Sequence, residues 1–417
     1  MPTNIHEKKF YPWLVVCLLW FVALLNYLDR QMLSTMKPSM MLDIPELTKA
    51  ENFGRLMAIF LWIYALMSPI SGIIADRLNR KWLIISSLCI WSAVTLSMGY
   101  ATTFNQIYIL RAIMGVSEAF YIPAALSLIA DYHQSNTRSI AIGIHTTGIY
   151  LGQAFGGFGA TFSSHFSWHL TFQSVGFIGV IYSVLLIIFI QEKKAYTIDV
   201  TQRITFGTEI KKMFKGLGIL FGNIAFWVLL FYFSAPSLPG WAVKNWLPTL
   251  FSETLHLNMA QAGPIATITI ASASFFGVLI GGFISDKWVM RNLKGRIYTG
   301  VIGLALTLPA LFLVGRGTSM ETILTGGILF GLGFGIFDTN NMPILCQFVA
   351  PRYRATGYGI MNLAGISAGA IITEFLGKAA DNGGMGHVFV LLTVVVVVAI
   401  IFQLVTLHPK TINMIED

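Results

Sequence analysis

Apolar residues along this chain come in long runs and do not alternate with polar ones. Stretches of about 20 mostly apolar residues, the length that a helix needs to cross a bilayer, recur between short polar segments. The pattern predicts an all-α membrane protein with twelve transmembrane helices, ten being the only other number that it allows. The two longest spans, 221–252 and 320–349, are expected to contain breaks or tilt. The twelve spans lie at 11–33, 53–75, 82–100, 104–130, 138–163, 168–190, 221–252, 261–284, 297–315, 320–349, 354–378 and 386–407.

The charge distribution adds a topology to this pattern. Only 11% of the residues are charged, and the net charge is +8. Of the 27 lysines and arginines, nineteen lie at the termini or in alternate loops and five in the other loops. This is the positive-inside asymmetry of membrane proteins. It predicts a multi-pass protein of the cell inner (plasma) membrane, embedded in lipid, with both termini cytoplasmic and no nucleic-acid partner. The first apolar run has the length of a span and no small-residue cleavage site, so it is interpreted as the first helix.

The sequence lacks the motifs of metal-binding, nucleotide-binding and metalloprotease sites. The three cysteines, Cys17, Cys89 and Cys346, all fall within predicted spans and have no metal-ligand spacing. The chain has no phosphate-binding G-x-x-x-x-G-K-S/T motif and no His-Glu-x-x-His motif. We therefore expect no metal, no cofactor and no enzymatic activity. The glycines at 327, 331 and 335 lie in mid-span and predict close helix packing.

The chain repeats itself at about half its length. Residues 72–77 read G-I-I-A-D-R and residues 282–287 read G-F-I-S-D-K, 210 positions later. An R-x-x-x-x-G pattern opens the spans at 138 and 354, and Pro123 has a counterpart in Pro343. Three matches predict two six-helix bundles. We expect an N-terminal bundle at 1–190, a polar and basic cytoplasmic linker at 191–220 and a C-terminal bundle at 221–417.

The segment at 72–81 resembles the signature G-x-x-x-D-R-x-G-R-K of the major facilitator transporters, with Asn79 in place of a glycine. The resemblance implies the major facilitator fold, with substrate bound near the bilayer midplane between two bundles. Anchoring of the loop at the cytoplasmic face by charge is the alternative. The resemblance implies conformational gating by Asp76, Arg77, Arg80 and Asp286.

Two further segments resemble the anion:cation symporter branch of that family, whose members carry hexuronates, aldonates, sialic acid and other organic anions. They are N-Y-L-D-R at 26–30 and R-A-I-M-G-V-S-E-A-F-Y-I-P at 111–123. The motif W-L-P at 246–248 and Asn362 extend the resemblance along the chain. Spinster-like lysolipid transporters share part of the pattern and are the rival. His145 and His169 stand at positions where members of the branch commonly have other residues. The resemblance therefore defines the transport mechanism better than it defines the substrate.

Four charges lie inside predicted spans: Asp29, Arg30, Arg111 and Glu118. Each costs about 2.5–3.5 kcal/mol at the centre of a membrane helix and therefore needs a partner or a water-filled cavity. Arg111 and Glu118 are seven residues apart, about 10 Å along a helix, too far to pair with each other. The first span must supply their partners. Because adjacent residues point about 100° apart, we expect one of Asp29 and Arg30 to reach the fourth span and the other to face the cavity.

These charges predict proton coupling. Burial raises the pKa of a carboxyl group and a neighbouring arginine lowers it, so an anion that engages the arginine can be exchanged for a proton. Asp29 and Glu118 are the proposed proton-coupling residues, which agrees with the acids that carry protons in the resembling branch. Arg30 and Arg111 would hold the anion, since arginine stays charged and grips a carboxylate through a planar fork. A static network that joins the two spans is the alternative.

The other candidates would line the cavity. Lys244 would be a second anchor for an anion, unless its amine reaches the outer interface along an apolar stem. Asp338 and Asn341 would bind sugar hydroxyls, unless they satisfy backbone groups freed by Pro343. The remaining candidate substrate-binding residues are Tyr27, His145, Gln153 and Asn362, with Tyr64 and Tyr150 as further lining.

The sequence thus predicts a proton-coupled symporter that imports a small organic anion, such as a sugar acid, by alternating access. Protons are the coupling ion, no other cofactor is expected, and a monomer suffices. The first alternative is a lysolipid or amphiphile transporter. The second is a transport-dead sensor with the same fold, which the intact Asp29, Arg111 and Glu118 disfavour.

Overall fold

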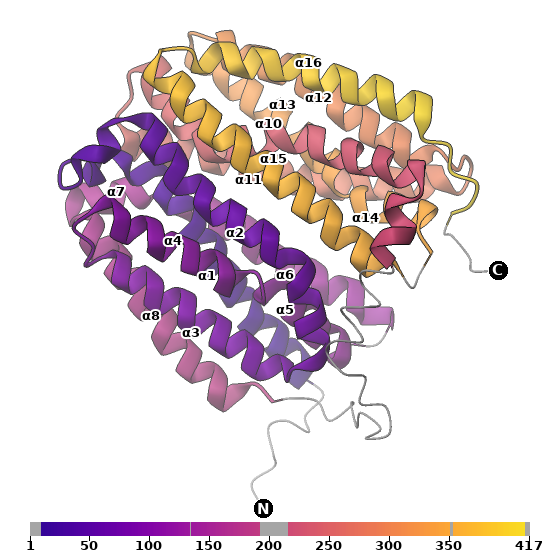
Figure 1. The fold of residues 1–417 in the computed structure, drawn as a ribbon, viewed down its shortest axis with the longest axis horizontal. Coiled ribbons are helices and arrows are strands. Elements are labelled where there is room, and N and C mark those ends of the chain that lie inside the picture. Colours follow the sequence, from indigo (N-terminus) through magenta and orange to yellow (C-terminus); the bar gives the residue numbers. More distant parts are fainter. Residues whose placement is uncertain (1–9, 134, 192–215, 351–352, 413–417) are drawn as a thin grey trace, which may run out of the picture.

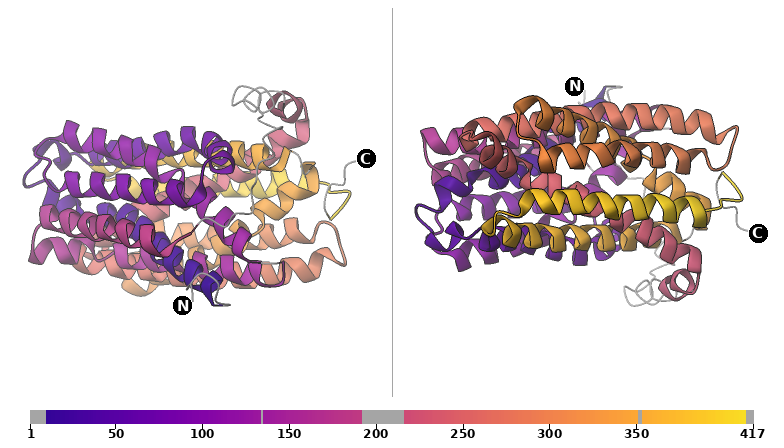
Figure 2. Two further views of the ribbon diagram at one scale, coloured as in Figure 1. Left: turned by 90° about the horizontal axis from the view of Figure 1, so that it is seen from below. Right: turned by 90° about the horizontal axis from the view of Figure 1, so that it is seen from above.

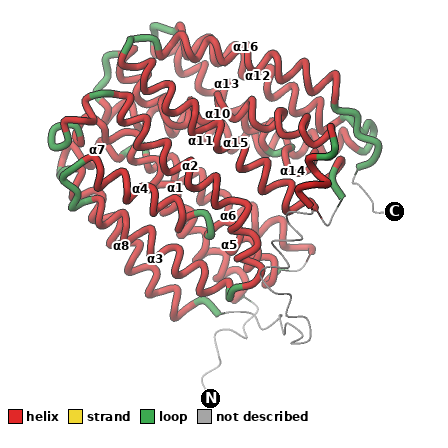
Figure 3. Tube along the Cα trace, in the orientation of Figure 1, coloured by secondary structure: helices red, strands yellow, loops and turns green. Residues whose placement is uncertain are grey.

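The computed structural model describes residues 10–133, 135–191, 216–350 and 353–412, and all regular structure in these ranges is helical (Figures 1 and 3). The N-terminal bundle contains α1 (Tyr11–Met40), the short η2 (Pro45–Thr48), α2 (Ala50–Arg77), α3 (Arg80–Met98), α4 (Phe104–Glu118), α5 (Tyr121–Tyr132), α6 (Ser135–Gly156), α7 (Gly159–His165) and α8 (Trp168–Phe189). The C-terminal bundle contains α10 (Ile224–Leu255), α11 (Met259–Val289), α12 (Gly295–Arg316), α13 (Met320–Asp338), α14 (Asn341–Phe348), α15 (Arg354–Asp381) and α16 (Met385–Thr406).

The helices match the predicted spans closely. In the described ranges, eleven segments are long and apolar enough to cross a membrane, and each coincides with a predicted span. The twelfth prediction, 138–163, corresponds to α6 and α7, which are interrupted at Gly157 and Phe158. The all-helical, multi-pass architecture is therefore confirmed. The linker prediction at 191–220 falls mostly on residues outside the described ranges and stays a prediction.

The breaks within the long spans differ in part from the expectation. The span at 320–349 does break, between α13 and α14, whereas α10 runs unbroken through Pro236, Pro239 and Pro248. Tilt, the alternative for the span at 221–252, stays a prediction. A break also separates α4 from α5, which the sequence did not predict. Pro123 is the third residue of α5 and Pro343 the third of α14, so both breaks lie at the same place relative to a proline.

The internal repeat has a structural counterpart in two arginines. Arg138 donates to the backbone carbonyls five and eight residues before it, at 3.4 and 3.2 Å. Arg354 donates to the carbonyls five and eight residues before it, both at 3.1 Å. Each arginine thus caps the end of the preceding helix, so the repeated R-x-x-x-x-G sequence has the same local structure in both halves.

The two bundles meet along α2 with α15 and along α6 and α7 with α11 (Figure 2). We call the end of the molecule that holds η2 and the α15–α16 connection the far end, because α1 begins and α16 ends at the opposite end (Figure 1). At the far end Asp381 accepts from the backbone N–H groups of Ala50 and Glu51, at 2.7 and 2.9 Å. The Lys378 amine lies 3.6 Å from the Glu51 carboxylate. These contacts hold the far end of the two bundles together.

Candidate functional site

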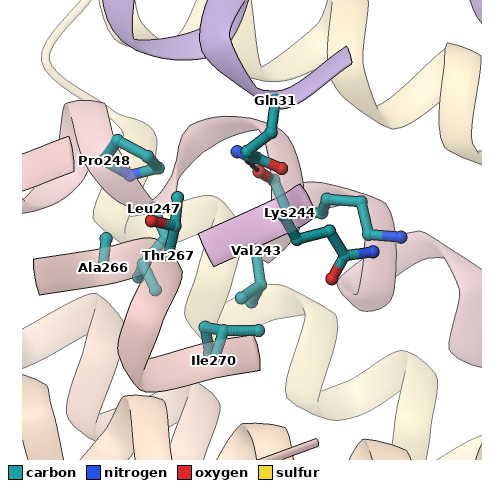
Figure 4. Close-up of a pocket in the computed structure, with 9 residues that line it drawn as sticks. Gln31, Val243, Lys244, Leu247, Pro248, Ala266, Thr267 and Ile270 are labelled. Carbon is teal, nitrogen blue, oxygen red and sulfur yellow. Dashed lines mark hydrogen bonds between the residues drawn. The ribbon is translucent and has the colours of Figure 1, made fainter. Parts of the chain in front are cut away.

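Two neighbouring cavities lie where α1 of one bundle faces α10 of the other. The larger has about 430 Å³ of empty space and the smaller about 280 Å³, and both are lined by Gln31 and Lys244. In Figure 4, Gln31 extends from α1 toward the part of α10 that carries Lys244 and Pro248, with Thr267 of α11 beyond it. The larger cavity is also lined by Tyr27, Arg30, Met57, Phe60, Leu61, Arg111, Trp241 and Asn245.

Three cations line the larger cavity, and they come from both bundles. Arg30 and Arg111 belong to the N-terminal bundle and Lys244 to the C-terminal bundle. The guanidinium carbons of Arg30 and Arg111 lie 4.9 and 4.7 Å from the ring centroid of Phe60, on α2, so the two arginines share one aromatic surface. Cations over an aromatic face are attracted to its negative potential. Phe60 was not among the predicted site residues, since an aromatic residue in an apolar span carries no distinguishing signal.

Arg30 joins α1 to α4. Its Nε donates to the Glu118 carboxylate at 2.5 Å, and Glu118 is completely buried while the Arg30 side chain is 12% exposed. Glu118 Oε1 and Arg30 Nη2 have no hydrogen-bond partner among the described residues. The expectation that the first span supplies a partner for Glu118 agrees with this geometry. Arg30 therefore bonds Glu118 through Nε, while its buried Nη2 has no partner among the described residues.

Asp29 has a different environment from the one expected. Its carboxylate accepts from the Thr95 hydroxyl of α3, and its side chain is only 1% exposed. Arg111 lies close enough to interact with it electrostatically. The expected division, in which one of Asp29 and Arg30 reaches the fourth span and the other faces the cavity, was wrong. Arg30 does both, because its long side chain bonds α4 while still lining the cavity, and Asp29 is directed to α3.

In the C-terminal bundle, Lys244 lines both cavities and Asp338 lies near enough to interact with it electrostatically. The Lys244 amine lies 4.7 Å from the Trp241 ring centroid and 5.9 Å from that of Tyr27. It therefore lines the cavity and does not reach the outer interface. Asn341 donates to the Asp338 carboxylate at 2.9 Å. Neither Asp338 nor Asn341, however, is among the residues that line the two cavities.

The remaining candidates fall into two groups. Gln153 lines the smaller cavity and Tyr27 the larger one, and Asn362 contacts the side chain of Tyr358. His145 instead is buried within the N-terminal bundle, where its Nε2 lies 2.8 Å from the hydroxyl of Tyr121. That hydroxyl donates to the backbone carbonyl of Leu19, so it accepts from His145. The predicted substrate contact of His145 does not agree with this position, since the ring packs between helices of one bundle.

The predicted gating residues lie toward the end of the molecule opposite the far end, which we call the terminal end. Arg80 forms an ion pair with Asp131, within the N-terminal bundle. Asp286 lies 3.9 Å from Arg296, within the C-terminal bundle. The side chains of Asp76 and Arg77 are outside the part of the chain that the structure describes. A gating role for these residues stays a prediction.

The site places a cavity lined by cations next to a buried carboxylate. Nowhere in the described ranges do three or more His, Cys, Asp or Glu side chains gather closely enough to hold a metal ion. The Arg30 guanidinium lines the cavity while its Nε is bonded to the buried Glu118 carboxylate.

The chain is similar to known transporters over most of its length. The family model described as Major Facilitator Superfamily matches residues 19–374. The hexuronate transporter of Bacillus subtilis (strain 168) is 25% identical, covering 87% of both chains. The D-galactonate transporter of Escherichia coli O6:H1 is also 25% identical, over 89% of this chain and 96% of its own. Among solved structures, a bacterial homologue of the human lysosomal transporter spinster, inward-facing and occupied, has a TM-score of 0.76 at 20% identity, over 96% of this chain and 97% of its own.

Proposed function

The chain belongs to the Major Facilitator Superfamily, and from that premise we propose that it is a proton-coupled symporter that imports an organic anion. The family makes it a multi-pass membrane transporter and not an enzyme. The substrate that we propose is a sugar acid, such as a hexuronate, an aldonate or sialic acid. We place it in the cell inner membrane with both termini in the cytoplasm, and a monomer suffices for alternating access of one central site.

The observation that carries the proposal is the set of three cations around one cavity. Arg30 and Arg111 approach it from one bundle and Lys244 from the other, so a bound anion would be held by both bundles at once. Charged groups at membrane depth are costly and persist where they bind a substrate or a coupling ion. The hexuronate and D-galactonate transporters among the relatives support a sugar acid as the substrate. The Asp338 and Asn341 pair would bind its hydroxyl groups.

Coupling would act through Arg30. An entering carboxylate competes with Glu118 for the guanidinium, and a proton on Glu118 removes that competition. Asp29, held by Thr95 and close to Arg111, would be the second proton site by the same logic. Anion binding and protonation would then favour each other, as symport requires.

Uptake into proteoliposomes tests the function. Labelled hexuronate, aldonate and sialic acid are offered under an inward proton gradient to the parent protein, to Glu118→Gln and to the control Glu321→Gln, an exposed residue of α13. We expect gradient-driven accumulation in the parent and the control. Glu118→Gln should lose it while retaining counterflow exchange, which needs no proton. Absence of uptake of every sugar acid by folded protein would refute the substrate class, and unchanged accumulation in Glu118→Gln would refute its coupling role.

A lipid-like substrate is the second candidate. The fold similarity to the spinster homologue and the aromatic lining contributed by Tyr27, Phe60 and Trp241 favour it. Three cations around one cavity favour a substrate that binds mainly through an anionic group, such as a sugar acid, over one that binds mainly through an alkyl chain. Lysolipid transport in the same proteoliposomes, with no sugar-acid uptake, would establish the alternative.

A further inference from the structure

Prolines inside α10, α11 and α12 each leave a backbone carbonyl without its normal helical donor, and two of these carbonyls accept from a side chain. In an α-helix each carbonyl accepts from the N–H four residues later, and proline has no N–H. Pro248 in α10 and Pro264 in α11 therefore free the carbonyls of Lys244 and Ala260. Both helices continue through these positions, so the freed carbonyls must find other donors.

In both cases the donor comes from the opposite bundle. The Gln31 side-chain amide of α1 donates to the Lys244 carbonyl at 3.0 Å. The Thr161 hydroxyl of α7 donates to the Ala260 carbonyl at 2.9 Å. We call these two contacts the cross-bundle bonds. An unsatisfied backbone carbonyl is costly away from water. At these two positions a proline of one bundle frees the carbonyl, and a side chain of the other bundle donates to it.

The positions of the cross-bundle bonds link them to the substrate cavity. Gln31 follows Arg30 in the chain and lines both cavities, and Pro248 lines the smaller one (Figure 4). Thr161 and Ala260 lie nearer the far end, next to the close approach of Gly157 to Gly263. The two bonds therefore extend from the cavity toward the end at which the bundles are closed.

We propose that Gln31 and Thr161 are positioning residues that hold the far side of the substrate cavity closed through the cross-bundle bonds, which break when the cavity opens toward the far end. A carbonyl freed by proline can exchange its side-chain donor for water without any unwinding of its helix. The prolines thus make the contact between bundles reversible at no loss of helical structure. An anion that binds Arg30 and Lys244 acts directly on the bond between Gln31 and the Lys244 carbonyl. Arg30 precedes Gln31 in the chain, and Lys244 carries the accepting carbonyl. The inference rests on alternating access from the proposed function, but on neither the substrate nor the proton.

Accessibility of a single cysteine tests it. Ala266 lines the smaller cavity and is 1% exposed, so Ala266→Cys is introduced after Cys17, Cys89 and Cys346 are replaced by serine. A membrane-impermeant maleimide is added on the side of the far end. Loss of one hydrogen bond that stabilises only the closed state should raise the population open to that side, and with it the labelling rate, about two- to tenfold. We expect this increase in Gln31→Ala and in Thr161→Val.

The decisive comparison restores the missing N–H. In Pro248→Ala the Lys244 carbonyl regains a helical donor, so Gln31→Ala should then have little further effect on labelling. The same holds for Thr161→Val in Pro264→Ala. Such non-additivity is the mark of a direct interaction between the two sites. Gln347→Ala is the matched control, because Gln347 is buried and donates to the carbonyls of Leu293 and Thr411 within its own bundle, and its loss should leave labelling unchanged.

Two results would overturn the inference. One is an unchanged labelling rate in both Gln31→Ala and Thr161→Val. The other is an increase of the same size whether or not the proline is present. If Gln31→Ala does not fold, Thr161→Val decides, since it keeps the shape of the side chain. Labelling requires neither substrate nor a proton gradient, so its outcome is independent of whether sugar acids are transported.

Discussion

At the scale of the residue, charge at membrane depth is the feature that the sequence predicted best. Arg30, Arg111 and Lys244 line one cavity, as their cost in a bilayer suggested. Their partners were less predictable. Asp29 bonds to Thr95 and Arg30 reaches Glu118, because side-chain length and helix rotation decide which neighbour is reached, and neither follows from spacing within one helix. Phe60 and Gln31 carry no sequence signal and were missed for that reason.

Lys244 provides the prediction at this scale. Lys244→Met should raise the apparent KM for the anion about tenfold to a hundredfold, the range expected for loss of one charged hydrogen bond. Lys244→Arg should restore most of the affinity, because it keeps the positive charge. KM and kcat are measured from initial rates of uptake, with Lys287→Met at the exposed terminal end of α11 as the control. An unchanged KM in Lys244→Met would mean that the anion binds to the N-terminal bundle alone.

At the scale of the element, hydropathy predicted the spans but not their interruptions. Prolines are visible in the sequence, yet Pro248 leaves α10 intact while α4 ends shortly before Pro123. At Pro248 the freed carbonyl accepts from Gln31 of the other bundle, so α10 continues there without an unsatisfied backbone group. This contact between bundles is not contained in a local pattern.

The start of α2 is also stabilised by a contact from the other bundle, and this contact gives a prediction. Its N-cap residue, Lys49, has no capping side-chain bond, and Asp381 of the other bundle accepts from the Ala50 and Glu51 amides in its place. Asn258 caps α11 through its own side chain. Loss of a cap costs about 1 kcal/mol. Asp381→Ala should weaken the closed far end as well as α2, so maleimide labelling at Ala266→Cys should increase.

The matched control for that prediction is Asn258→Ala. It removes a cap of similar strength that lies within one helix, so it should lower the Tm of the detergent-solubilised protein with no increase in labelling. Equal effects of the two variants on labelling would show that Asp381 stabilises α2 alone. It would then have no part in joining the bundles.

At the scale of the whole molecule, the internal repeat was the most informative part of the sequence. It predicted two six-helix bundles. The repeated R-x-x-x-x-G sequence has the same local structure in both halves, where Arg138 and Arg354 cap equivalent helix ends, and the boundaries of the bundles stay a prediction. The arrangement of the bundles relative to each other could not be predicted, because a transporter of this kind must adopt more than one. The contacts at the far end, absent from any local pattern, define the arrangement seen here.

Close approach of backbones at the far end makes this arrangement testable. A Cβ atom added at Gly54 of α2 would lie 2.9 Å from the Thr373 carbonyl oxygen and 3.3 Å from the Gly377 Cα of α15. Since these are backbone atoms, α2 and α15 would have to separate. Gly54→Ala should therefore favour the state that is open at the far end. Spin labels at Thr48 and Asn382, on opposite bundles, should report a longer distance than in the parent protein.

The contrasting variant is Gly143→Ala in α6, where an added Cβ meets no atom within 4 Å. It makes the same chemical change in a helix of the same bundle, so it controls for the higher helix propensity of alanine. The spin-label distance should match that of the parent. If Gly54→Ala also leaves the distance unchanged, the contact between α2 and α15 is loose enough to absorb a methyl group. Closure of the far end would then depend on the polar contacts of Asp381, Gln31 and Thr161 and not on the packing of small residues.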